Sequence, residues 1–595
     1  MFKPALSFVA CATLVASLEA QELLLDPIVV TATKTEQSLK NVTSNVEVIT
    51  GHELQEKHII SISEALNLIP GVSVVSNGGL GKSTSVFLRG FDSKRTLVLI
   101  DGVRYNDISN SIDGVSFEHL MVNQIEQIEV IKGAQSGIWG SEASAGVINI
   151  ITKKARTGTA FNAHLDYGSF ATKRYGADVS HKNDKFEFQA GANKITSDGF
   201  TAYAKRYHAI DGYEDDGYKN RTATIKAGYN FDDQNKIHAA HTDIDVYTEY
   251  DNYNGDSAKS YTKKEKLSQI SFENKNTIAS TKLYANRSSF KRDYSDGSEF
   301  DGRVNEQGLT SEIPYNSSDF ILLGGDYKSF EHLNQFNKKF TDKALFVTNS
   351  NIVNDRLILT ESLRRDDYDA FDDRTTGKIG IKYNFDTGIY LSSNYGTGYN
   401  VPTLYQLYDG TYGNTELKSE DTRSYDLSFG YNGFEITYFS NRVKDMIDYD
   451  FTTSAYNNIN GTSTLKGTEI SYKRELIDTA LLSLSYTRLS AKNQQGQNLR
   501  RRAKENLKFS VDYYGFSKMH LGLNGEYVGT RYDQENNQGA QTGRYTIANA
   551  VANYDLSETI KMYVKIDNIT DKYYQSVNNY ATSPRAYYTG LEISF

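Results

Sequence analysis

Cysteine, tryptophan and proline are scarce in this sequence of 595 residues, which holds one cysteine, one tryptophan and six prolines. The cysteine, Cys11, lies in an N-terminal stretch with the pattern of a secretory signal, so the mature chain is expected to have neither a disulfide nor a cysteine metal site. No apolar run approaches the ~18 residues that a membrane-spanning helix needs. These absences exclude a disulfide-stapled scaffold, a thiolate metal centre and a helical membrane protein.

Residues 1–20 predict a secretory signal that is removed from the mature chain. Lys3 supplies a positive charge, residues 5–18 form an apolar core, and Ala20 ends a tolerable cleavage site. A short buried helix is the alternative, and the polar Gln21 and Glu22 directly after this stretch disfavour it.

The composition fits several classes of protein. A hydrophobic content of 38% and a net charge of −9 are typical of a soluble acidic protein. A transmembrane β-barrel gives the same values, because only every second strand residue faces lipid and the lumen is polar. The 43 tyrosines fit the aromatic girdles of such a barrel, and they also fit a carbohydrate-binding protein or a secreted β-solenoid.

Alternation of apolar and polar residues dominates the chain from Ala160 to its last residue, which predicts successive β-strands. One clear example runs through Phe161, Ala163, Leu165 and Tyr167. Short turns such as 230–235 alternate with long polar segments such as 245–265 and 400–420. This asymmetry is typical of barrels with short periplasmic turns and long external loops.

The first 155 residues have a different, mixed α/β pattern. A helix is predicted to end at Pro70-Gly71, and residues 128–154 join two β-branched runs through a Gly/Ser/Ala-rich middle. The loop 76–84 ends in Gly-Lys-Ser and suggests a phosphate-binding loop, but that motif needs a glycine where Ser76 stands. A strand rather than a helix is predicted to follow, so we exclude nucleotide binding.

Several motifs in the same order resemble those of TonB-dependent outer-membrane receptors. The similar stretches are 89–90, 99–104, 128–154, 395–408, 414–420 and 567–574, and the terminal Phe595 is similar to the outer-membrane assembly signal. The resemblance implies an all-β transmembrane barrel of ~22 antiparallel strands over residues 156–595. An α/β plug domain over 41–155 would lie inside the lumen, after a periplasmic segment over 21–40.

The segment just after the signal resembles the TonB box of this family, which comprises Asp26, Pro27, Ile28, Val29, Val30, Thr31 and Ala32. The sequence shows no strand partner nearby, so we expect a free strand that pairs with the sheet edge of another protein. The first strand of a folded domain is the alternative. The resemblance implies that the chain is a monomer whose partner is TonB with its inner-membrane energising complex. It also implies contacts with outer-membrane lipids and with the barrel assembly machinery, and no binding of nucleic acid.

The resemblance is strongest to the cobalamin receptors of the family, and it implies active transport of a scarce large nutrient. It places substrate contacts at Ser83, Ser85, Asp92, Asn110 and Ser111, for which solvated loop residues are the alternative. A ferric-siderophore receptor is the alternative within the family, and a passive porin or surface adhesin is the alternative outside it. Haem receptors of this family carry a histidine between the two signature segments, and residues 401–420 contain none, so the resemblance does not imply haem. The sequence contains no catalytic constellation that would predict an enzyme.

Acidic residues concentrate in two neighbouring stretches, 211–217 and 243–256. Calcium needs six to eight oxygen ligands, which two adjacent loops can supply. The resemblance to cobalamin receptors implies calcium at Glu214, Asp216, Tyr250 and Asp251, although Thr201 stands where the family pattern has an aspartate. The alternative is that these are solvated acidic loops.

Overall fold

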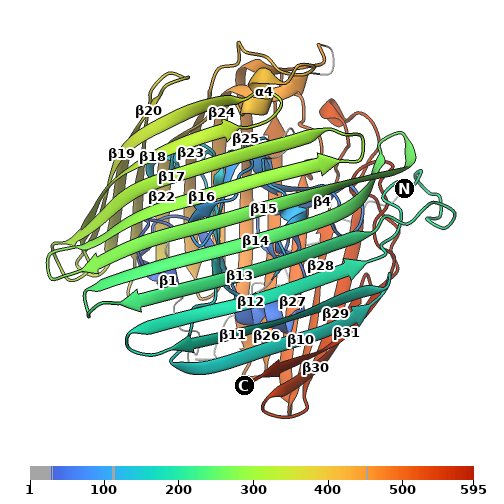
Figure 1. Cartoon of the computed structure of the whole chain (residues 1–595), viewed down its shortest axis with the longest axis horizontal. Coiled ribbons are helices and arrows are strands. Elements are labelled where there is room, and N and C mark those ends of the chain that lie inside the picture. Colours follow the sequence, from blue (N-terminus) through green and yellow to red (C-terminus); the bar gives the residue numbers. More distant parts are fainter. Residues whose placement is uncertain (1–27, 30, 110–113, 123, 451–452) are drawn as a thin grey trace.

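The computed structural model describes residues 28–29, 31–109, 114–122, 124–450 and 453–595. It contains a large barrel that encloses a smaller domain formed by the N-terminal part of the chain (Figure 1). The predicted signal and five of the predicted site residues, namely Asp26, Pro27, Val30, Asn110 and Ser111, lie outside the described residues.

The described residues form a closed antiparallel barrel of 22 strands, β10 to β31. Each strand pairs with the next in the chain, and β31 pairs with β10 to close the ring. The strands are β10 (Gly158–Gly168), β11 (Thr172–Lys182), β12 (Phe186–Ser197), β13 (Tyr218–Asn230), β14 (Asn235–Asn252), β15 (Gly255–Lys275), β16 (Ser280–Tyr294), β17 (Glu299–Pro314), β18 (Phe320–His332), β19 (Lys338–Val353), β20 (Leu357–Tyr368), β21 (Arg374–Asn384), β22 (Ile389–Asn400), β23 (Glu420–Tyr431), β24 (Phe434–Asp450), β25 (Ala455–Ile477), β26 (Ala480–Lys492), β27 (Glu505–Phe516), β28 (Met519–Val528), β29 (Tyr545–Asp555), β30 (Ile560–Asp567) and β31 (Ala586–Ser594).

The predicted alternation is confirmed in the barrel wall. In β10, Leu165 is 60% exposed on the outer surface, whereas the next residue, Asp166, is buried on the lumen side. Closure matters because every backbone N–H and C=O inside a membrane needs a partner, and a closed barrel has no unpaired strand edge. The 22-stranded barrel thus confirms the predicted fold class.

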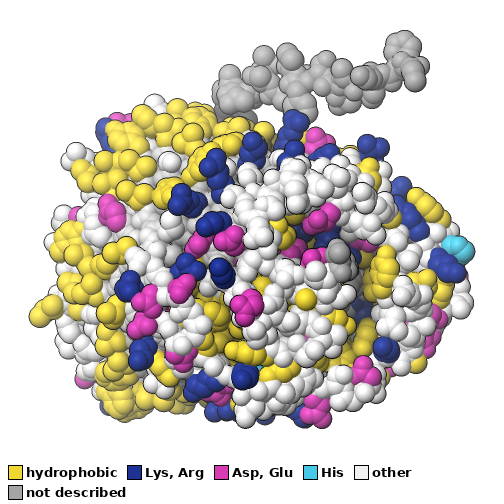
Figure 2. Space-filling model, turned by 90° about the horizontal axis from the view of Figure 1, so that it is seen from above, with side chains coloured by type: hydrophobic (Ala, Val, Ile, Leu, Met, Phe, Trp, Pro, Cys, Tyr) yellow, Lys and Arg dark blue, Asp and Glu magenta, His cyan; other side chains and the backbone are white. Residues whose placement is uncertain are grey.

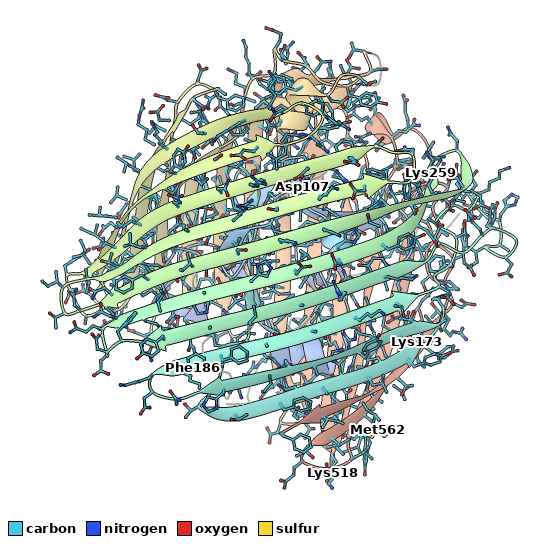
Figure 3. All side chains as sticks on the ribbon, in the orientation of Figure 1. Asp107, Lys173, Phe186, Lys259, Lys518 and Met562 are labelled. Atoms are coloured by element: carbon cyan, nitrogen blue, oxygen red, sulfur yellow. The ribbon has the colours of Figure 1, made fainter. Side chains whose placement is uncertain are left out.

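The two ends of the barrel differ. One end, called the turn end here, carries short connections such as 183–185 and 517–518, while the loop end carries long segments such as 198–217, 401–419 and 568–585. Phe186 and Lys518 mark the turn end in Figure 3, and Lys173 and Lys259 mark the loop end. A short helix, α4 (Leu404–Tyr408), lies at the loop end (Figure 1).

The enclosed domain, called the plug here, is built around a five-stranded sheet with the order β3-β8-β9-β6-β7. Its elements are β3 (Val46–Thr50), α1 (Gly51–Glu56), α2 (Ile62–Leu66), β4 (Val72–Ser76), β5 (Thr84–Leu88), β6 (Thr96–Ile100), β7 (Val103–Arg104), β8 (Ile125–Lys132), α3 (Ser136–Trp139) and β9 (Gly146–Thr152). Strands β4 and β5 form a separate hairpin. Short 3-10 helices occur at Leu39–Asn41, Ser93–Arg95, Phe117–His119 and, in a barrel loop, Glu535–Asn537.

The Gly/Ser/Ala-rich stretch after β8 allows the chain to turn back tightly into β9. Gly146 begins β9 with φ of 155°, and a Cβ there would lie 2.2 Å from the carbonyl oxygen of Ile131 and 2.6 Å from Leu88. Only glycine fits a backbone that comes this close to its neighbours. The main hydrophobic core then joins plug side chains such as Leu66 and Ile128 to Phe290 of the barrel wall. None of the described helices is long and apolar enough to cross a membrane.

Buried ion pairs join the plug to the barrel wall. The guanidinium of Arg89 donates to both oxygens of Glu469 at 3.0 and 2.9 Å and lies 3.7 Å from Asp426. The ammonium of Lys132 also donates to Glu469, at 3.2 Å. Arg89 and Lys132 are 1% exposed, so these contacts lie deep between the two parts.

We predict that Arg89→Met loosens the plug, because Glu469 and Asp426 then lose a buried counter-charge. Breaking a buried ion pair costs on the order of 3–5 kcal/mol. Hydrogen exchange of plug amides in the purified protein should become markedly faster. Lys154→Met is the matched control, because the Lys154–Glu36 pair is largely exposed, with side chains 78% and 64% accessible. Equal exchange rates of the plug amides in the two variants would show that Arg89 does not hold the plug to the barrel wall.

Candidate functional site

The plug presents one loop, residues 77–83, to the acidic segments at the loop end of the barrel. Its ends are joined by a hydrogen bond from the Asn77 amide to the Ser83 carbonyl, at 2.9 Å. Gly81 packs on the ring of Tyr218, where a Cβ would lie 2.0 Å from a ring carbon. Ser83 is exposed and Ser85 is half-buried. The loop is therefore fixed by close packing, with Ser83 open to solvent.

Lys82 connects this loop to the barrel. Its ammonium donates to the carbonyl oxygens of Asp216 and Gly217, at 3.0 and 3.2 Å, and to the hydroxyl of Thr248 at 3.2 Å. Burial lowers the pKa of Lys82 to about 8, although the carboxylates of Asp216, Glu249 and Asp251 raise it. This role could not be predicted from the sequence, because the partners lie more than 130 residues further along the chain.

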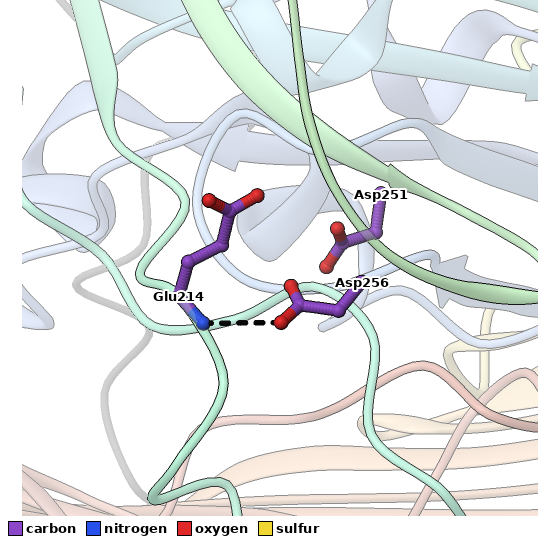
Figure 4. Close-up of side chains that lie close together, drawn as sticks. All are labelled: Glu214, Asp251 and Asp256. Atoms are coloured by element: carbon purple, nitrogen blue, oxygen red, sulfur yellow. Dashed lines mark hydrogen bonds between the residues drawn. The ribbon is translucent and has the colours of Figure 1, made fainter.

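Three carboxylates of the acidic stretches meet at the loop end. Oxygens of Glu214, Asp251 and Asp256 all lie within 4.8 Å of one another (Figure 4). The Glu214 amide donates to Asp256 at 3.3 Å, which joins loop 198–217 to the β14–β15 hairpin. Asp251 is buried, and it accepts hydrogen bonds from the Tyr203 amide and the Thr201 hydroxyl, at 2.7 and 3.2 Å. Thr201 thus binds an acidic residue of the cluster through its hydroxyl.

The other two residues proposed for calcium have different surroundings. Asp216 accepts a hydrogen bond from the Ala202 amide at 2.6 Å, and burial together with the adjoining Asp251 raises its pKa to about 7. The ring of Tyr250 packs against Tyr261 and Tyr294, with centroids 5.8 and 6.1 Å apart. Asp256 belongs to the acidic stretch 243–256 in the sequence, but only the fold of the β14–β15 hairpin brings it close to Glu214.

Asp92, a predicted substrate contact, is engaged in ion pairs. Its carboxylate accepts two hydrogen bonds from Arg95 at 2.6 Å, and Arg502 of the barrel lies 3.8 Å away. These cations hold the pKa of Asp92 well below its usual range, with Arg95 the strongest of them and burial acting in the opposite direction. Arg95 in turn donates to Glu420 of β23 at 2.8 Å. Asp92 therefore ties the plug to the wall in this structure.

The stretch 395–408 forms the end of β22 and helix α4, which lies over the lumen at the loop end. Thr403 and Gln406 cap the first turn of α4 reciprocally, each side chain bonding the other's backbone amide. The ring of Tyr405 then packs against Phe300 and Tyr456, with centroids 5.9 and 6.3 Å apart. The loop end is thus lined by aromatic side chains as well as acidic ones, and Figure 2 shows a hollow in the surface with charged side chains of both signs around it.

At the turn end, the described residues of the predicted TonB box are folded against the plug. Strand β1 (Ile28–Val29) pairs with β2 (Gln37–Ser38) in a small antiparallel hairpin. The expectation that this strand has no partner nearby was therefore wrong. A short strand eight residues further along supplies the pairing, and a two-residue strand was too short to recognise from the sequence pattern.

Thr31 fixes the segment to the plug sheet. Its amide donates to Glu129 of β8 at 2.8 Å, its hydroxyl binds the same carboxylate, and Asn149 of β9 donates to that hydroxyl at 3.0 Å. The Trp139 indole donates to the Thr31 carbonyl at 3.0 Å. Val29 and Ala32 are buried beside Thr31.

Phe595 closes the barrel at the turn end. Its amide donates to the Phe161 carbonyl at 2.8 Å, and the Phe161 amide donates back at 3.0 Å. The side chain itself is 71% exposed on the outer surface. The last residue therefore offers its aromatic ring outward at the seam between the first and last strands.

Comparison with known proteins agrees with this architecture. A family model described as "TonB dependent receptor-like, beta-barrel" matches residues 154–569, and one described as "TonB-dependent Receptor Plug Domain" matches residues 38–147. The chain belongs to the TonB-dependent receptor family. This is a family of outer-membrane transport receptors, so the protein is an outer-membrane barrel.

Two curated relatives span nearly the whole chain. The chain is 26% identical over 593 residues to the "Vitamin B12 transporter BtuB" of Vibrio cholerae, covering 96% of this chain and 95% of that protein. It is 27% identical over 604 residues to the protein of the same name from Photobacterium profundum, covering 97% and 96%.

Solved structures of siderophore receptors are similar to this one. The siderophore receptor PirA from Acinetobacter baumannii has a TM-score of 0.81 at 18% identity, covering 92% of this chain and 98% of that one. A variant of the ferric enterobactin receptor PfeA from Pseudomonas aeruginosa, in complex with enterobactin, has a TM-score of 0.79 at 17% identity, covering 93% and 100%. At 17–18% sequence identity, this similarity establishes a shared fold and not a shared substrate.

We predict that Lys82→Met frees the acidic loop from the plug. The variant lacks the ammonium that donates to Asp216, Gly217 and Thr248. The amides of residues 198–217 should therefore exchange hydrogen several-fold faster in the metal-free protein. Lys205→Met is the matched control, because Lys205 lies exposed in the same loop. If both variants exchange like the parent protein, Lys82 does not order this loop.

Proposed function

We propose that this receptor carries cobalamin, or a closely related corrinoid, across the outer membrane. The observation that supports this is the 26–27% identity to two vitamin B12 transporters over almost the entire length of each protein. The siderophore receptors share the fold at 17–18% identity. A ferric siderophore is therefore the competing substrate class, which the binding test below distinguishes.

The substrate docks at the loop end, which faces the outside in the proposed orientation. Ser83 is exposed on the plug loop and Ser85 follows on β5, so both remain proposed substrate contacts. Asp92 supports the substrate surface through Arg95 rather than by offering a free carboxylate. The protein acts by binding and movement rather than by catalysis.

Calcium orders the acidic loops in this proposal. Glu214, Asp251 and Asp256 supply carboxylate oxygens, with Asp216 beside Asp251 and Tyr250 on the same hairpin. The donor set fits, because calcium prefers oxygen ligands and because neighbouring carboxylates repel one another without a cation. Burial is the main cause of the raised pKa of Glu214, and the carboxylates of Asp256 and Asp251 raise this pKa further. Lys82 links the same loop to the plug.

Energy enters at the turn end in this proposal, through TonB and its inner-membrane complex. A pull on the box acts first on Thr31, whose partners Glu129 and Asn149 lie on β8 and β9. Strand β8 also carries Lys132, which binds Glu469 of the barrel. The force therefore reaches a plug–barrel ion pair through one strand. The exposed ring of Phe595 serves the barrel assembly machinery, and the barrel works as a monomer in outer-membrane lipid.

Titration of the detergent-solubilised protein with cyanocobalamin tests the substrate and calcium together. We expect tight, saturable binding that weakens at least about tenfold in chelator or in Asp251→Asn/Asp256→Asn, because the loops lose their cation. Asp243→Asn is the control, since Asp243 lies on the same hairpin but pairs with Lys266 at 3.6 Å. If the protein binds a ferric siderophore and not cobalamin, the siderophore is the substrate and the cobalamin assignment is wrong. If chelator leaves the affinity for cobalamin unchanged, the calcium site is contradicted and the cobalamin assignment stands.

Deletion of residues 26–32 tests the energy input. We expect cells with the deletion to bind cobalamin at the surface but to lose energised uptake. Ile28→Pro should act in the same direction, because proline removes the backbone donor that strand pairing uses. Ile28→Val is its control, since this side chain is 57% exposed and contributes little packing. Uptake that survives the deletion would overturn the TonB-box assignment.

A further inference from the structure

The outer wall of the barrel has a groove near its loop end, where two strands separate. Strands β21 and β22 pair only up to Lys378 and Gly396, so the first residues of β21 have no partner in β22. The hydroxyl of Thr397 replaces the missing ladder by bonding the amide and carbonyl of Gly377, at 2.9 and 3.3 Å. The groove beside this opening has a volume of about 1100 Å³ and extends across β21 to β25.

Positive charge dominates the lining of this groove. Five of the lining residues are cations and two are anions: Arg374, Arg423, Arg442, Lys444 and Lys466 against Asp373 and Asp421. Both anions already have cationic partners. Asp421 lies 3.3 Å from Arg374, and Asp373 lies 2.6 Å from Arg365. Lys444 lies 3.8 Å from Asp445, so the net positive charge of the groove comes from Arg423, Arg442 and Lys466.

Arg423 and Arg442 stand directly opposite each other in the β23–β24 ladder, and both are exposed on the outer surface. Like charges in directly opposed positions destabilise a sheet unless an anion lies between them. The structure gives neither guanidinium a carboxylate partner among the described residues. The pair thus has the geometry of a site that an external anion completes.

Several outward cations on the other side of the barrel have carboxylate partners. Arg221 of β13 stands opposite Asp245, and Lys266 of β15 stands opposite Asp243. Both form ion pairs with these carboxylates. Opposed cations also occur elsewhere on the outer wall, where Arg221 stands opposite Lys194 and Lys264 stands opposite Lys291. One member of each of those pairs has a carboxylate partner, Asp245 for Arg221 and Asp293 for Lys291, whereas neither Arg423 nor Arg442 has one among the described residues.

The groove lies at the upper boundary of the lipid-facing surface. Tyr425 and Tyr438 line its lower part, with ring centroids 6.0 Å apart, as expected of an interfacial aromatic girdle. Below them toward the turn end, Leu427 and Leu391 are exposed on the outer surface. A ligand here would meet cations above, aromatic rings at its middle and apolar side chains below, which is the profile of an anionic amphiphile.

We propose that this groove binds the phosphorylated headgroup of an outer-leaflet glycolipid. Arginine guanidinium groups suit phosphate because they donate parallel hydrogen bonds to its oxygens. Arg423 and Arg442 hold the phosphate between them, and Lys466 extends the positive field. The acyl chains follow Tyr425 and Leu427 down the wall.

Native mass spectrometry of the full-length protein in mild detergent, titrated with bisphosphorylated lipid A, tests the proposal. We expect one lipid to be retained, and its retention to fall at least about tenfold in Arg423→Gln/Arg442→Gln, because each cation near an anionic headgroup contributes to binding. Arg221→Gln/Lys266→Gln is the charge-matched control and should retain lipid like the parent. Heat-modified migration in SDS gels verifies that each barrel is folded.

Two further arms identify the ligand chemistry. Lipid A stripped of its phosphates should bind no better to the parent protein than to the double variant. Inorganic phosphate at millimolar concentration should fail to displace the bound lipid, because it lacks the acyl chains. Equal retention of the stripped lipid, equal loss in the control variant, or full displacement by inorganic phosphate would each overturn the glycolipid assignment.

Discussion

Charge buried between the plug and the barrel wall must be paired, and the rest of this structure depends on that constraint. The lumen of a transmembrane barrel is polar, so the plug cannot be held by an apolar interface alone. Glu469 on the wall is shared by Arg89 and Lys132 of the plug. Arg95 and Glu420 form a second connection of the same kind. Each pair is favourable only while both partners stay in register, because an unpartnered buried charge is costly.

This mode of attachment suits the movement of the plug that we propose. Buried ion pairs fix one position and are lost when the strands that carry them shift, because each pair needs close contact between two charged groups. Strand β8 carries both Glu129, which binds Thr31, and Lys132, which binds Glu469. The two contacts lie three residues apart in the second half of the eight-residue strand β8. In the proposed mechanism, displacement of the N-terminal segment therefore acts on the strand that also carries the wall contact.

The outer surface follows a different constraint, set by its surroundings. Backbone groups are satisfied by closure of the ring, which leaves side chains to match lipid, interface and water in turn. Where β21 and β22 separate, Thr397 restores the lost hydrogen bonds with its side chain. The same separation opens the groove beside the opposed Arg423 and Arg442. A local break in the ladder thus creates a surface feature without opening the barrel.

The sequence by itself determined the alternating strands and the mixed α/β pattern of the first 155 residues, because a period of two and short-range turn signals are local properties of the chain. The closed barrel of ~22 strands around a plug was expected only from the resemblance to TonB-dependent receptors. It also placed Glu214 and Asp251 in two acidic stretches. Only the tertiary structure decided that Asp256 joins them, that Lys82 binds the same loop, and that Ile28–Val29 pairs with a strand of the same segment. These contacts depend on strand register and on residues brought together by closure of the ring. The same register places Arg423 opposite Arg442, which no spacing within one strand can reveal.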